Sequence, residues 1–226
     1  PYRSAPYILL GNIQPELQLH VLDQVETPRF VMADTMNLWI DTAKDALDEV
    51  VRRVDLLTVN DSEAREYTGE DSLARAARKM LDMGPSQVLV KKGEHGSILF
   101  SEDGGVFVLP AFLLDEVADP TGAGDSFAGT FMGVLAASGG TDEAVMRRAL
   151  VYANAVAAFG VEAFSLDRLS SLIRQSDKRA RDAIHKLLLH TDIARLFQLL
   201  QMRGKVTARQ PRLVEQEGKI SAVHGR

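Results

Sequence analysis

Short apolar runs alternate with longer mixed stretches along the first part of the chain. The runs are rich in Val, Ile and Leu, as buried strands are, and the stretches between them carry apolar residues at helical spacing. In residues 42–53, Ala43, Leu47 and Val50 fall on one stripe. Strands are predicted at residues 7–10, 29–33, 56–59 and 87–91, and helices at residues 15–25, 42–53, 61–67 and 72–83. This alternation predicts βαβ units and a parallel sheet with helices on both faces.

A hairpin pattern follows residue 91. Two apolar runs, 97–100 and 106–109, flank the turn sequence Asp-Gly-Gly at residues 103–105. Helices are then expected at residues 124–138, 142–159 and 166–175. The elements together predict the α/β class, with helices in layers on a mostly parallel central sheet.

The composition limits the class of protein. The chain has 226 residues, a net charge of −5 and no cysteine, which excludes a disulfide framework, a thiolate nucleophile and a Cys-based zinc site. An acidic chain lacks the basic surface that binds nucleic acid. No apolar run is long enough to span a membrane, and the first residues do not resemble a signal peptide. We therefore expect a cytoplasmic protein with one sizeable core.

The charge divides the chain in two. Residues 177–226 hold 11 Lys and Arg against 5 Asp and Glu, whereas residues 1–176 hold 15 against 26. Such an asymmetry usually marks a separate unit, so we predict a core at 1–176 and a basic tail at 177–226. The tail keeps helical periodicity over residues 178–202. Three roles stay open for it: a contact on the core or between copies in a homodimer, a solvated basic face, or a non-native end.

Small residues and a carboxylate open the helix expected at residues 124–138. The stretch reads Gly122-Ala123-Gly124-Asp125. The first amides of a helix lack partners within it and carry a partial positive charge, so they form an anion site that small residues leave accessible to phosphate. A carboxylate beside such a site can accept the proton of an attacking hydroxyl. Phosphoryl transfer needs both functions, yet the same residues also fit an ordinary helix start that the carboxylate caps.

The longer stretch D-P-T-G-A-G-D-S-F, residues 119–127, resembles the second signature of the PfkB/ribokinase family of sugar and nucleoside kinases. The resemblance implies a ribokinase-like three-layer α/β/α fold. It also implies ATP-dependent transfer of a phosphoryl group to a hydroxyl of a sugar or sugar-like molecule. Asp125 would be the catalytic base, and the amides of Gly122, Ala123 and Gly124 would hold the developing charge.

Two further stretches match the family's motifs. Asn60 and Glu63 follow a strand and resemble the N-x-x-E motif, which implies that they organise Mg²⁺ and its waters. The same pair is also an ordinary helix N-cap with a capping-box glutamate. Lys91, Gly93 and Gly96 resemble the strand and turn before the nucleotide loop, which implies contact with ATP. The alternative is a plain turn with solvated lysines.

Isolated polar residues complete the candidate site. The resemblance places Asn154 at the adenine pocket, although it also fits as an ordinary polar residue on an Ala-rich helix. It places Asp119 and Thr121 where some members hold a monovalent cation such as K⁺, with Thr121 on the nucleotide side. Asp34 and Asn37 follow a strand and are expected either to border the substrate cleft or to cap a loop.

The resemblance covers residues 7–176 and lacks the family's N-terminal part. The Gly-rich first signature, the acidic residue that grips the sugar and the lid have no counterpart. A lid and an acceptor pocket keep water from ATP in such kinases, so we expect either an upstream segment or a truncated product. Missing strands would leave an apolar sheet edge exposed. A sugar kinase is preferred; a catalytically incomplete nucleotide-binding or interaction fragment and a nucleoside kinase are the alternatives.

Overall fold

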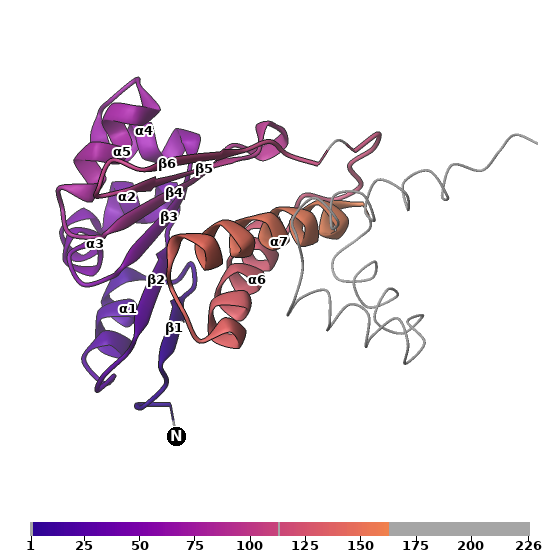
Figure 1. Cartoon of the computed structure of the whole chain (residues 1–226). Coiled ribbons are helices and arrows are strands. Elements are labelled where there is room, and N and C mark those ends of the chain that lie inside the picture. Colours follow the sequence, from indigo (N-terminus) through magenta and orange to yellow (C-terminus); the bar gives the residue numbers. More distant parts are fainter. Residues whose placement is uncertain (1, 113, 163–226) are drawn as a thin grey trace, which may run out of the picture. The chain divides into compact units, whose positions relative to one another are not determined.

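The computed structural model describes residues 2–112 and 114–162 (Figure 1). The chain divides into two compact units, Pro1–Leu189 and His190–Arg226, and all of the described residues belong to the first. The helix expected at 166–175, the boundary expected near residue 176 and the basic tail lie outside the described residues.

In the described part of the chain, six strands form one sheet in the order β1-β2-β3-β4-β5-β6 (Figure 1). Neighbours from β1 to β4 are parallel, and β5 and β6 join as antiparallel strands. The strands are β1 (Tyr7–Leu10), β2 (Phe30–Asp34), β3 (Leu56–Asn60), β4 (Gln87–Lys91), β5 (Ser97–Ser101) and β6 (Val106–Leu109). The mostly parallel sheet and its hairpin are therefore as predicted.

The helices follow the predicted periodicity with one break. They are α1 (Pro15–Leu22), α2 (Asn37–Thr42), α3 (Lys44–Val51), α4 (Asp61–Thr68), α5 (Leu73–Leu81), the 3₁₀ turn η1 (Gly93–His95), α6 (Ala123–Ser138) and α7 (Glu143–Val161). The prediction of one helix over residues 42–53 is wrong at its start. Ala43 has φ −140° and ψ 36°, and this non-helical residue separates α3 from the short helix α2.

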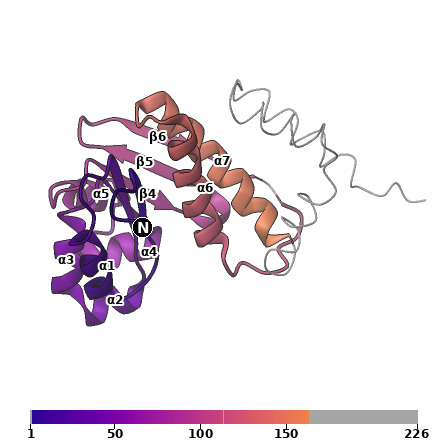
Figure 2. The ribbon, with the colours of Figure 1, turned by 90° about the horizontal axis from the view of Figure 1, so that it is seen from below.

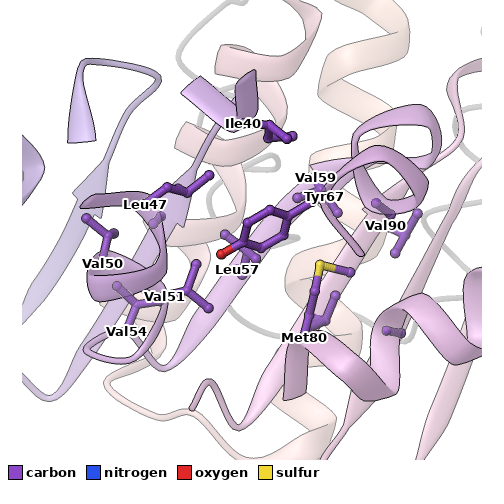
Figure 3. Packing of buried hydrophobic residues seen from close by; sticks show 14 of the residues in the cluster. Ile40, Leu47, Val50, Val51, Val54, Leu57, Val59, Tyr67, Met80 and Val90 are labelled. Carbon is purple, nitrogen blue, oxygen red and sulfur yellow. The ribbon is translucent and has the colours of Figure 1, made fainter. Parts of the chain in front are cut away.

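The sheet divides the helices into two layers. The helices α1 to α5 lie on one face, and α6 and α7 lie on the other, as the view from below shows (Figure 2). Side chains alternate between the faces along each strand. Val31, Leu57, Val59 and Val90 point into the first layer, where they meet Met80 and other apolar residues of the helices (Figure 3).

The second face carries the alternate residues of the same strands. Met32, Leu56 and Leu89 are fully buried there, as is Phe131 on α6. By the same alternation, Asp34 at the end of β2 and the last residue of β4 belong to this face. The alternation therefore places the polar residues at the ends of β2 and β4 on the face that α6 covers.

The helix α7 has the length and hydropathy of a membrane-spanning segment, alone among the described helices. More than half of this stretch, 56%, is buried within the protein, and it packs along α6. A core helix of this kind passes the same test of length and hydropathy.

Apolar side chains are exposed on α1 and on β1, the strand at the outer edge of the described sheet. Leu9 on β1 is 36% exposed, and Leu17 and Val21 on α1 are 54% and 38% exposed. The last two are four residues apart and share one helix stripe. No described strand pairs with this edge of β1.

Tyr67 links α4 to α3 through its hydroxyl group, which donates to Asp48 Oδ1 at 2.6 Å. Lys44 Nζ lies 4.1 Å from the centre of the Tyr67 ring and 3.3 Å from Asp48 Oδ1. Burial raises the pKa of the Tyr67 phenol, and the hydrogen bond to Asp48 raises it further. The phenol therefore stays protonated and acts as a donor at any ordinary pH.

We expect Tyr67→Phe to lower the free energy of unfolding by about 1 kcal/mol, because it removes this hydrogen bond and keeps the ring. Urea unfolding followed by circular dichroism measures the loss. Tyr2→Phe is the matched control, since Tyr2 is 83% exposed and its substitution should leave the unfolding curve unchanged. Equal stability of Tyr67→Phe and the native protein would contradict the prediction.

Candidate active site

The carboxyl ends of three neighbouring strands form the centre of the candidate site. β2 ends at Asp34, β3 at Asn60 and β4 at Lys91. The register pairs Asn60 with Lys91 across β3 and β4. Parallel strands bring their carboxyl ends to one edge of the sheet, which is where α/β proteins bind their ligands.

Lys91 and Asp34 form an ion pair across the intervening strand β3. Lys91 Nζ lies 3.1 Å from Asp34 Oδ1 and 3.3 Å from Oδ2. The Asp34 side chain is 7% exposed and that of Lys91 is 20% exposed. Burial raises the pKa of the Asp34 carboxyl, and the charge of Lys91 opposes that rise. The sequence places Asp34 at a substrate cleft or a loop cap, and the structure places its carboxylate on Lys91.

The start of α6 lies beside the tip of Lys91. Gly122 is the N-cap residue with φ 80°, a left-handed conformation that favours glycine. The Ala123 amide donates to Pro120 O at 3.2 Å, whereas the Gly124 amide has no acceptor among the described residues. A Cβ built on Gly124 would lie 3.6 Å from Lys91 Nζ. The ammonium group of Lys91 therefore lies close to Gly124, whose amide is unpaired among the described residues.

Asp125 occupies the first turn of α6 and is exposed. The N-cap residue Gly122 offers no side chain to cap α6, and Asp125 is the acidic residue of the first turn, a place that suits both an ordinary helix start and a catalytic base. A smaller electrostatic contribution from Asp125 raises the pKa of the Asp34 carboxyl, so the two carboxylates act on each other across the site.

Asn60 and Glu63 form a capping box at the start of α4. Asn60 Oδ1 accepts from the Glu63 amide at 2.7 Å, and Glu63 Oε2 accepts from the Asn60 amide at 2.7 Å. Burial raises the pKa of the Glu63 carboxyl, while the Asn60 amide and the charge of Lys91 lower it. The ordinary helix-cap interpretation is therefore correct, and it holds both side chains beside Lys91.

The oxygen atoms of this pair suit a hard cation. Within residues 2–112 and 114–162, no three His, Asp or Glu side chains gather to hold a metal by themselves. Mg²⁺ takes one or two protein oxygens, keeps several waters and completes its shell with phosphate. Asn60 and Glu63 each offer side-chain oxygens of the kind that a hard cation takes, so their role at a metal ion stays a prediction.

The turn after β4 brings the nucleotide-side candidates together. Gly93 opens η1, and Gly96 has φ 88° with a Cβ position only 2.0 Å from Leu109 O. Asn154 on α7 donates from Nδ2 to Ser97 Oγ at 3.3 Å and is 9% exposed. The hydrogen bond joins α7 to the first residue of β5, next to Gly96.

Three further candidates, Asp119, Thr121 and Asn37, make hydrogen bonds of their own. Asp119 Oδ1 accepts from the Thr121 amide at 2.9 Å and shapes the loop before α6. Asn37 Nδ2 donates to Glu66 Oε2 at 2.6 Å, on the exposed side of α2 and α4. This bond ties Asn37 to α4, so a role at a substrate cleft stays a prediction.

Gln18 on α1 is a site residue that the sequence interpretation missed. It is 1% exposed, and its Nε2 donates to Gly11 O at 2.9 Å and to Asp34 O at 3.0 Å. It therefore joins the ends of β1 and β2. The only signal in the sequence was a polar residue inside the helix predicted at residues 15–25. Periodicity alone cannot tell whether such a glutamine is buried or exposed.

The sequence of the chain is similar to those of known kinases. Residues 6–171 match the pfkB family carbohydrate kinases. A cytidine kinase from Thermococcus kodakarensis is 33% identical over 135 residues, which cover 58% of this chain and 48% of that protein. A deoxyribokinase from Salmonella typhi is 35% identical over 106 residues, which cover 45% and 34% respectively.

Solved structures agree with the fold. Ribokinase from Thermotoga maritima superposes with a TM-score of 0.58 at 25% identity, covering 75% of this chain and 57% of that one. The chain spans between a third and a half of the length of the two curated relatives. From the family match, which covers most of the chain, and from the ribokinase-like sheet, we conclude that this chain belongs to the pfkB family of carbohydrate kinases.

Proposed function

We propose that the protein containing this chain transfers the terminal phosphoryl group of ATP to a hydroxyl of a sugar or sugar-like small molecule. The observation that carries the proposal is the position of Lys91 Nζ beside Gly124, a residue at the start of α6 whose amide has no acceptor among the described residues. A fixed cation and an unpaired helix amide stabilise the charge that develops on a transferred phosphoryl group. Membership of the pfkB family supports the same reaction.

Each residue of the loop has a role in that step. Asp125 takes the proton of the acceptor hydroxyl as the hydroxyl oxygen bonds to the γ-phosphorus, and the bond from that phosphorus to ADP breaks. The amides of Gly122 and Gly124 hold the negative charge. Ala123 belongs to the same loop, but its amide donates to Pro120 O, so the charge falls to the other two amides.

The remaining candidates serve the nucleotide and its cations. Asn60 and Glu63 would hold Mg²⁺, which neutralises the phosphates when bound. The turn of Gly93 and Gly96 and the amide of Asn154 would contact the nucleotide. A monovalent cation such as K⁺ near Asp119 and Thr121, a homodimer and a cytoplasmic location also stay predictions.

The acceptor class is tested with the full-length protein, ATP and Mg²⁺ against a panel of pentoses, hexoses and nucleosides. Nucleosides belong in the panel because of the similarity to a cytidine kinase. We expect one acceptor class to support ADP formation at about 1–100 per second, as kinases do, with a phosphorylated product visible by mass spectrometry. ATP binding without acceptor-dependent ADP formation across the panel would contradict the proposal and favour the nucleotide-binding alternative.

A further inference from the structure

We propose that Asp34 is a positioning residue, which holds the ammonium group of Lys91 at the start of α6 and makes no contact with the acceptor. The inference rests on the proposed function in one respect, since Lys91 is taken to meet the phosphoryl group. It assigns Asp34 a different task from that of bordering the substrate cleft.

The geometry explains why Lys91 needs a partner. Its flexible side chain has many rotamers, so an unrestrained ammonium group would occupy many positions. The bonds of 3.1 and 3.3 Å to the two oxygens of Asp34 restrict it to one. That position is the one beside Gly124.

Asp34 is itself held in place by three elements of the fold. Its backbone carbonyl accepts from Gln18 Nε2 at 3.0 Å, and its Oδ1 accepts from the Thr35 amide at 3.1 Å. Gln18 also binds Gly11 O at the end of β1. Gln18 thus fixes the backbone of Asp34, and the Thr35 amide fixes its Oδ1, as supporting hydrogen bonds fix the ligands of a preorganised site.

Competing carboxylates make the choice of partner important. The charge of Lys91 also acts on the Glu63 carboxyl, and Asp125 lies within electrostatic reach of Asp34. Without Asp34, the ammonium group would be free to turn toward Glu63 and away from Gly124, or toward Asp125 within the first turn of α6. Because both Asp34 oxygens accept from Lys91 and the side chain is 7% exposed, little of the carboxylate is left for a substrate.

A double-mutant cycle in the full-length protein tests the assignment. Asp34→Asn keeps the size of the side chain, and we expect it to lower kcat about 10- to 100-fold, as loss of supporting residues does. The KM for the acceptor should stay within about twofold, because uniform substrate binding is untouched. Lys91→Met should lower kcat at least as far, and Asp34→Asn should add nothing in its background. Asp41→Asn, an exposed carboxylate on α2, is the control and should match the native protein.

Two results would overturn the positioning role. In the first, the effects of the two substitutions on kcat add, which would show that Asp34 acts independently of Lys91. In the second, Asp34→Asn raises the KM for the acceptor in the Lys91→Met background, which would show that Asp34 contacts the acceptor. Asp34→Glu retains the charge and should restore activity to a level between Asp34→Asn and the native protein. If the native protein transfers phosphate but the cycle is additive, only this inference fails and the proposed function stands.

A chemical readout that needs no activity completes the test. Acylation of lysines by an amine-reactive ester, followed by mass spectrometry of peptides, reports the freedom of each amine. Asp34→Asn should increase the labelling rate of Lys91 several-fold and leave that of its neighbour Lys92 unchanged. Unchanged labelling of Lys91 would show that the ion pair does not hold the amine, whatever the acceptor proves to be.

Discussion

Asp125→Asn is expected to lower kcat of the full-length protein about 10²- to 10⁴-fold, the usual contribution of a general base. The amide has the size of the carboxylate but cannot take the proton of the acceptor hydroxyl. Asp125 is exposed and makes no side-chain hydrogen bond within the described residues. Its substitution should therefore leave the fold and the affinity for ATP unchanged.

The measurement separates chemistry from binding. Initial rates of ADP formation give kcat, and calorimetric titration gives the Kd for ATP with Mg²⁺. Asp82→Asn is a suitable control because Asp82 is an exposed residue at the end of α5. Phosphoryl transfer by Asp125→Asn at close to the native rate would show that the base lies elsewhere.

Gly96→Ala is expected to cost about 3–5 kcal/mol of stability, among the largest effects of a single substitution. Gly96 has φ 88° and ψ −142°, a region that is essentially limited to glycine and that costs other residues about 1–3 kcal/mol. In addition, the new methyl carbon would lie 2.0 Å from Leu109 O and 2.7 Å from the Ala111 amide nitrogen. The end of β6 would have to move, because backbone atoms cannot turn aside as a flexible side chain can.

Gly93→Ala provides a matched control in the same turn. Gly93 has φ 55°, and a Cβ there meets nothing within 4 Å, so alanine should cost only about 1–2 kcal/mol. Urea unfolding followed by the fluorescence of Trp39, the single tryptophan, compares the two variants. Equal losses of stability in the two variants would show that the close contact with Leu109 O and the Ala111 amide does not matter, and that the positive φ alone accounts for the effect.

Gly96→Ala should also disturb the candidate site, because the turn that contains Gly96 directly follows Lys91. The Lys92 amide donates to Gly96 O at 2.7 Å, which closes the turn directly after Lys91. A shift of Gly96 would displace the end of β4 and with it the cation beside α6. We therefore expect any Gly96→Ala protein that folds to lose activity as well as stability.

The elements that could be predicted were those with a local pattern of apolar residues. The runs at residues 7–10, 56–59 and 87–91 became strands because each is short and mostly apolar, the pattern typical of parallel strands between helix layers. The break at Ala43 was not visible, since its neighbours continue the helical stripe. A single residue with non-helical dihedrals is set by how two helices meet the sheet rather than by its own propensity.

The candidate site shows the same division. The loop ending in Asp125 and the pair of Asn60 and Glu63 each lie within one short stretch, so a motif describes them. The partnership of Asp34 with Lys91 joins residues 57 positions apart, and that of Gln18 with Asp34 joins a helix to a strand. No local pattern encodes these contacts.

By itself, the sequence determined the class of fold, the loop at the start of α6 and the family to which they point. The spacing of apolar residues and the glycines that a turn requires are local patterns of a few residues, so they can be recognised in the sequence alone. Only the tertiary structure decided which side chains face one another. The register of β2, β3 and β4 sets which strand ends share an edge and a face, and a shift by one residue would turn Asp34 away from α6 and separate it from Lys91.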